Sequence, residues 1–192
     1  LRTHEVLVMA QFPLGLAALN DMQATRSAIH AVYYRPLVPL TRMLQMELQD
    51  AGSFYWELKK PTLLIVECLS PTDRPIYDLS RGAWEFIQQE MSYAYEVTVA
   101  AADTVAAVAA LVERQRPDIL LISAHGAIGP APNQRSIRIG NELYTGIEIP
   151  WLPPLVLLSV CATAPRGAGD INVADLMLRH HPHAVLCCMV PV

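Results

Sequence analysis

The sequence predicts an α/β fold with a mostly parallel central sheet and helices on both of its faces. From residue 62 onward, short apolar segments of strand length alternate with amphipathic segments, a pattern typical of parallel strands joined by helices of about ten to fifteen residues. Most of the strand-like segments are continuously apolar, as expected of strands buried on both faces. The chain has 192 residues, 53% of them hydrophobic, which is enough for one domain with a substantial core.

The N-terminal part has a weaker pattern than the rest. Residues 5–10 are expected to form a strand, and residues 37–49 a helix, because leucines recur there at helical spacing. We therefore expect residues 1–60 to be an N-terminal extension or a join to an upstream module. Residues 61–192 are expected to form the main domain.

Five segments of the main domain are predicted to be strands, because they are apolar or alternate apolar with polar residues. In chain order they cover 63–67, 95–99, 119–122, 155–158 and 184–190. A smaller hairpin is predicted from 137 to about 144, with Gly140 and Asn141 as its turn.

Three helices are predicted between these strands, each from a capping residue followed by an apolar face. The expected caps are Ser80, Asp103 and Asn172. Pro117 and Pro182 are expected to end the second and third helices. Three connections rich in Pro, Gly, Asp or Asn are expected to be loops, at 70–78, 126–134 and 162–170.

Composition and charge argue against several function classes. Fourteen Lys and Arg against eighteen Asp and Glu give a net charge of −4, which disfavours a dedicated nucleic-acid binder. No apolar stretch is long enough to cross a bilayer, and Glu5 lies where a signal peptide carries positive charge. The four cysteines lie in or beside apolar runs without a disulfide-type spacing. We therefore expect reduced thiols, a cytoplasmic location, no nucleic-acid partner and no membrane contact.

The two ends of the chain suggest a fragment. Residue 1 is Leu, and the chain stops at Val192 directly after an apolar run. Chain ends usually lie exposed at the surface, so we expect a longer polypeptide and a main domain truncated at its C-terminus.

Two of the predicted strands lead into side chains suited to nucleophilic chemistry. The strand at 119–122 is followed by His125 and Gly126, and the strand at 155–158 by Cys161. Reactive groups of open α/β sheets lie beyond the carboxyl ends of the strands, so these side chains would meet if the two strands are neighbours. A thiol becomes an effective nucleophile when a base such as His lies within hydrogen-bond reach. The pattern predicts a Cys–His dyad, against the alternative that the cysteine only packs in the core.

The two motifs resemble those of the CHAT family, caspase-like cysteine peptidases of the clan that also holds caspases, separases and gingipains. The family pattern is an apolar strand leading into His-Gly and a second apolar strand leading into Ser-x-Cys-x-Thr. Here the motifs are Ser-Ala-His-Gly at 123–126 and Ser-Val-Cys-Ala-Thr at 159–163, each preceded by an apolar run. The resemblance covers about two-thirds of the chain, from about residue 60 onward.

This resemblance implies a caspase-like three-layer sandwich and a bacterial-type cysteine endopeptidase without cofactor or metal. Cys161 would be the nucleophile, and His125 the general acid that protonates the leaving amine, with no third residue required. The backbone N–H groups of Gly126 and Cys161 would form the oxyanion hole. The implied partners are a protein or peptide substrate and a regulatory sensor or repeat module in the same or another chain.

The chain also departs from the family pattern. The family often has an acidic residue where Ala162 stands, a Gly where Ala164 stands, and a Trp-containing segment with a further helix near the C-terminal end, all of which differ or are missing here. These departures concern the loops around the substrate and leave the dyad motifs intact.

Substrate recognition in this clan involves the loop after the first core strand and residues near the cysteine. We expect Asp73, Asp78 and Ser159 to contact substrate. Acidic residues in this loop would suit an Arg or Lys before the cut, whereas Arg74 would suit an acidic residue. Asp73 and Asp78 are also ordinary turn and capping residues, so no preference follows from the sequence.

Two alternatives to a constitutively active peptidase stay open. The first is a caspase-like domain that has lost catalysis and serves as a scaffold or interaction module. The second is a zymogen whose loops at 126–134 and 162–170 become ordered when a partner binds.

A zinc site near the C-terminal end is a weaker alternative. His180, His181 and His183 are followed by Cys187 and Cys188. Successive residues of a strand point to opposite faces, and histidines are favoured at a helix C-terminus by the macrodipole alone. We therefore expect no metal.

Overall fold

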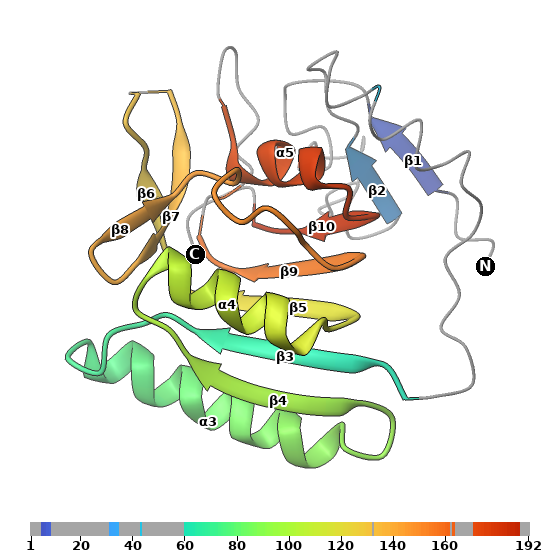
Figure 1. Cartoon of the computed structure of the whole chain (residues 1–192), viewed down its shortest axis with the longest axis vertical. Helices are drawn as coiled ribbons and strands as arrows, with labels where there is room; N and C mark the ends of the chain where they lie inside the picture. Colours follow the sequence, from blue (N-terminus) through green and yellow to red (C-terminus); the bar gives the residue numbers. More distant parts are fainter. Residues whose placement is uncertain are drawn as a thin grey trace, which may run out of the picture.

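A computed structural model describes residues 5–8, 31–34, 43, 60–131, 133–161, 163 and 171–188. Its centre is a five-stranded sheet with the strand order β10-β9-β5-β3-β4 (Figure 1). All four neighbouring pairs are parallel, which confirms the predicted α/β class and parallel sheet. The strands are β3 (Thr62–Glu67), β4 (Glu96–Ala101), β5 (Ile119–Ser123), β9 (Leu155–Ser159) and β10 (Ala184–Leu186).

Helix α3 (Arg74–Glu90) packs against one face of this sheet through Trp84. Alternate residues of a strand point to opposite faces, so a continuously apolar strand such as β3 supplies a core on each side. The buried residues on the α3 side are Leu63, Ile65, Trp84, Ile119 and Leu121.

Helices α4 (Val105–Gln115) and α5 (Val173–Met177) contribute to the core on the other face. Leu64 and Val66 of β3 point to this side and are completely buried. The central strands β5 and β9 contribute their own alternate residues to the same core, namely Leu120, Ile122, Val156 and Leu158. Helices therefore pack on both faces, as predicted.

A small antiparallel sheet lies beyond the carboxyl ends of the parallel strands (Figure 1). It consists of β6 (His125–Ile128), β7 (Arg135–Ile139) and β8 (Glu142–Tyr144). The β7–β8 hairpin was expected, and its turn contains Gly140 with φ of +57°, a conformation that favours glycine. Buried side chains of β7 and β8 join the main core.

Several boundaries in the β3–α4 region differ from the sequence predictions. Helix α3 begins at Arg74 rather than after Ser80, so the loop predicted over 70–78 ends at Asp73 and Ser80 lies inside the helix. Pro75 favours the earlier start, because proline lacks an N–H and is tolerated in a first helical turn. Helix α4 is capped by Thr104, not by Asp103, and the Thr104 hydroxyl accepts the Ala107 N–H at 3.1 Å.

The segment after β5 also differs from the sequence prediction. The loop predicted over 126–134 is wrong in its first half, because the backbone at 125–128 pairs with β7 as strand β6. The strand predicted over 184–190 ends at Leu186 in the described part of the chain. The cap at Asn172 is confirmed, since its side chain accepts the Asp175 N–H at 2.8 Å.

The N-terminal part of the chain is described only in short pieces. Strands β1 (Glu5–Val8) and β2 (Ala31–Tyr34) pair in parallel with each other, which agrees with the strand predicted near residue 5. The helix predicted over 37–49 lies outside the described residues apart from Met43. In the described ranges, no helix is long and apolar enough to cross a membrane.

Candidate active site

Strands β5 and β9 are direct neighbours, as the predicted dyad requires. Their parallel register pairs Ser123 with Ser159 at the carboxyl ends. His125 follows Ser123 by two residues, and Cys161 follows Ser159 by two residues. The structure therefore places the two motifs side by side at the same edge of the sheet, where open α/β folds locate their ligands.

Gly126 brings the two motifs into backbone contact. A Cβ atom added at Gly126 would lie 2.1 Å from the carbonyl oxygen of Cys161 and 3.1 Å from its carbonyl carbon. Side chains do not tolerate such distances, so only glycine allows β6 to approach the cysteine this closely. Cys161 forms no disulfide and is partly exposed, which is the accessibility that a nucleophile needs.

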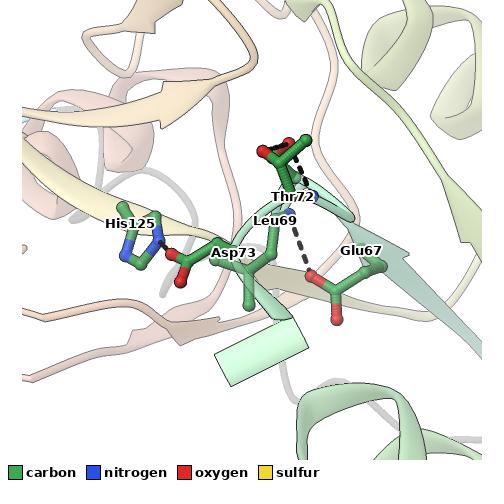
Figure 2. Close-up of polar contacts among 6 residues, drawn as sticks. Glu67, Leu69, Thr72, Asp73 and His125 are labelled. Atoms are coloured by element: carbon green, nitrogen blue, oxygen red, sulfur yellow. Dashed lines mark hydrogen bonds and ion pairs between the residues drawn. The ribbon is translucent and has the colours of Figure 1, made fainter. Parts of the chain in front are cut away.

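The side chain of Asp73 contacts His125. Asp73 Oδ2 lies 2.7 Å from Nε2 of His125, and the two side chains are 39% and 41% exposed (Figure 2). Asp73 was expected to contact substrate, and sequence reasoning did not find this contact with the histidine. The relevant sequence feature was the position of Asp73 in the segment that follows β3. Strand β3 pairs with β5 just as β5 pairs with β9, so the segments that follow β3 and β5 are neighbours.

A buried carboxylate lies at the end of β3, close to this site. Glu67 is only 6% exposed. Its Oε2 accepts hydrogen bonds from the Ser80 hydroxyl and from Trp84 Nε1, the latter at 2.8 Å. Its Oε1 accepts the Leu69 N–H at 3.0 Å (Figure 2). The Ser80 oxygen is also 3.0 Å from the hydroxyl oxygen of Ser123, so the Glu67 cluster (Glu67, Leu69, Ser80, Trp84 and Ser123) connects the ends of β3 and β5 with α3.

The sequence patterns did not predict the hydrogen bonds of this cluster. The available signal was a charged residue at the end of an otherwise apolar strand, followed by a tryptophan and a serine on the next helix. A buried carboxylate requires hydrogen-bond donors, and these side chains supply them.

The other two residues predicted to contact substrate lie on α3 and at the end of β9. Asp78 lies on α3 and is exposed, and Ser159 is the exposed last residue of β9. Among the described residues, Asp73 is the one of these three whose side chain contacts His125. The expected switch loop at 162–170 lies outside the described residues except for Thr163.

The thiols of the described region differ in their surroundings. Cys68 is buried, whereas Cys161, Cys187 and Cys188 are partly exposed. Burial, and after it the charge of Glu67, raises the pKa of the Cys68 thiol to about 12. Cys68 therefore stays protonated near neutral pH and is unsuited to be a nucleophile.

The histidines of the weaker zinc alternative line a recess elsewhere. Among the described residues, no group of three or more His, Cys, Asp or Glu could hold a metal ion. His180, His181 and His183 border a recess of about 470 Å³ together with Trp151 and Arg179. Pro154, which precedes β9, also lines it, so the recess is at the opposite end of that strand from Cys161.

Comparison with known proteins adds no family to this geometry. No protein-family model matches the chain, and no curated protein matches it significantly. A functional assignment therefore depends on the residues and contacts of the site itself.

Proposed function

We propose that the chain is a caspase-like cysteine endopeptidase that cleaves protein substrates, with Cys161 as nucleophile and His125 as general acid and base. The observation that carries this proposal is the equivalent placement of the two residues beyond neighbouring parallel strands. The direct backbone approach of Gly126 to Cys161 supports it further. The proposal includes membership of the CHAT family and its three-layer sandwich, and the helices on both faces of the parallel sheet are consistent with that fold.

The chemistry follows from these roles. His125 takes the thiol proton of Cys161, and the thiolate sulfur attacks the carbonyl carbon of the scissile peptide bond. The backbone N–H groups of Gly126 and Cys161 stabilise the oxygen anion of the tetrahedral intermediate. The protonated histidine then gives its proton to the leaving amine as the C–N bond breaks, and a thioester remains. A water molecule, deprotonated by the same histidine, hydrolyses the thioester and restores the free thiol.

Cleavage by a Cys161→Ala variant tests the proposal directly. We expect the variant to lose at least about a thousand-fold in rate, because no other group replaces the nucleophile, while its thermal unfolding midpoint stays near that of the wild type. The measurement is peptide-library cleavage followed by mass spectrometry. Cys188→Ala, which changes another partly exposed thiol, is the matched control and should keep full activity.

Labelling with a thiol-reactive peptidyl probe separates the proposed enzyme from a scaffold. Selective modification of Cys161 over Cys188 supports the enzyme. No labelling preference together with no cleavage would instead favour a catalytically silent interaction module. Full cleavage by the Cys161→Ala variant would overturn the assignment of Cys161 as the nucleophile. Cleavage that begins only when a regulatory partner is added would identify a zymogen.

A further inference from the structure

We infer that Asp73 is a positioning residue that orients His125 through Nε2 and leaves Nδ1 to serve Cys161. This inference rests on the proposed function and adds a third residue to a site that its motifs describe as a dyad. The observation behind it is the 2.7 Å contact between Asp73 Oδ2 and His125 Nε2 (Figure 2).

The contact determines which ring nitrogen carries the proton. An ionised carboxylate is only an acceptor, so the imidazole must donate from Nε2. A neutral imidazole has one N–H and one lone pair, and its lone pair is then on Nδ1. That nitrogen can accept the thiol proton, and the same carboxylate stabilises the imidazolium that forms, which is how the acidic residue of a Ser-His-Asp triad acts.

The local structure holds Asp73 in place for this role. The Asp73 N–H donates to the Ser70 carbonyl oxygen at 2.9 Å, and the Asp73 carbonyl accepts the Tyr77 N–H at 2.9 Å. Within the same turn, the hydroxyl oxygens of Ser70 and Thr72 are 2.7 Å apart (Figure 2). The residue is therefore fixed by a turn on one side and by the first turn of α3 on the other, and such support is what an oriented site requires.

The helix itself gives a second argument. Asp73 is the N-cap of α3, and aspartate is among the residues that cap helices best. Yet its carboxylate forms no capping hydrogen bond with the helix. The side chain is directed to His125 instead, so the helix lacks a stabilising contact that its sequence could supply.

The sheet order gives a third argument. Asp73, His125 and Cys161 follow β3, β5 and β9, which are adjacent strands in that order. In this order, the segment that carries the histidine lies between the segments that carry the carboxylate and the thiol. A carboxylate that served only to bind a basic substrate side chain would not need to contact the histidine.

The first experiment determines the tautomer of His125 and does not depend on proteolysis. Nitrogen-15 NMR of ring-labelled protein reports which nitrogen carries the proton, and a His125→Gln variant identifies its signals among the six histidines. We expect the Nε2–H tautomer in the wild type and in Glu90→Gln, an exposed change on the same helix. Asp73→Asn should lose this preference, and Asp73→Glu should partly restore it. An unchanged tautomer in Asp73→Asn would overturn the inference even if Cys161 proves to be the nucleophile.

The second experiment separates positioning from substrate recognition. For the peptides that the wild type cleaves, Asp73→Asn should lower kcat by about a hundred- to ten-thousand-fold with little change in KM, whatever residue precedes the cut. A rise in KM confined to Arg and Lys substrates would show that Asp73 binds substrate and would overturn the inference. If Cys161→Ala keeps full activity, the proposed function fails, while the NMR result still tests the Asp73–His125 contact.

Discussion

Two acidic side chains, one at the end of β3 and one just before α3, lie in very different surroundings. Glu67 is buried and accepts hydrogen bonds from a hydroxyl, an indole and a backbone amide. Asp73 is 39% exposed and contacts an imidazole. Neutral donors such as the Trp84 indole do not titrate, so the first carboxylate has fixed partners. The partner of the second is an imidazole, whose two ring nitrogens can donate and accept protons.

The comparison indicates that one short stretch of chain contributes both to the packing of the fold and to the candidate site. The Glu67 cluster fixes the end of β3 and the first half of α3 against Ser123 of β5. Asp73 lies in the chain between Glu67 and the body of α3, and its side chain is 39% exposed. The buried carboxylate therefore contributes to the packing of β3 against α3, and the exposed one contacts the histidine of the candidate site.

Replacing each carboxylate by alanine should give the largest contrast in stability. Glu67→Ala leaves the Trp84 indole and the Leu69 N–H buried without their acceptor, at about 1–3 kcal/mol each, so we expect a loss of about 3 kcal/mol in the free energy of unfolding. Asp73→Ala removes a partly exposed contact and should cost less than about 1 kcal/mol. Urea denaturation measures both, and equal losses in the two variants would remove the distinction.

A second pair of variants tests whether the candidate site needs the close backbone approach of Gly126 to Cys161. In Gly126→Ala, the new methyl group meets the Cys161 carbonyl, which should cost about 1–3 kcal/mol in stability and about a hundred-fold in cleavage rate through displaced reacting groups. Gly82→Ala is the matched control, since nothing lies within 4 Å of its new Cβ. In the helix interior it should stabilise the protein by roughly 0.5–1 kcal/mol. A neutral Gly126→Ala would mean that the two motifs move apart without consequence.

Most of the sheet could be predicted from the sequence, because buried parallel strands are continuously apolar. The order of β3, β5 and β9 could not, since every apolar run satisfies the same pattern. Strand β6 was missed because its few residues, with Gly126 near their start, resemble a loop until β7 pairs with them. The start of α3 was predicted too late in the chain because serine is a common capping residue. The Ser80 hydroxyl instead donates a hydrogen bond to Glu67.

The candidate site was predictable to a similar extent. His125 and Cys161 were found because each follows an apolar strand, which is a local pattern. The partner side chains of Glu67 and Asp73 lie 13 to 52 residues away in sequence, and no local pattern contains that information. A buried or paired carboxylate can be recognised only when the strand order is known.

A small effect is expected for Cys68, the residue after Glu67, and it tests whether the core keeps this thiol protonated. Burial, and then this charge, raises the thiol pKa from 9.0 to about 12, so the folded protein keeps the proton while the unfolded chain loses it above about pH 9. Stability from this group is complete below pH 9 and falls as the pH rises toward 12. At pH 10 we expect Cys68→Ala to abolish a pH-dependent loss of about 1 kcal/mol relative to pH 7. Urea midpoints of wild type and variant at both pH values measure it, and parallel pH dependences would show that the thiol ionises normally.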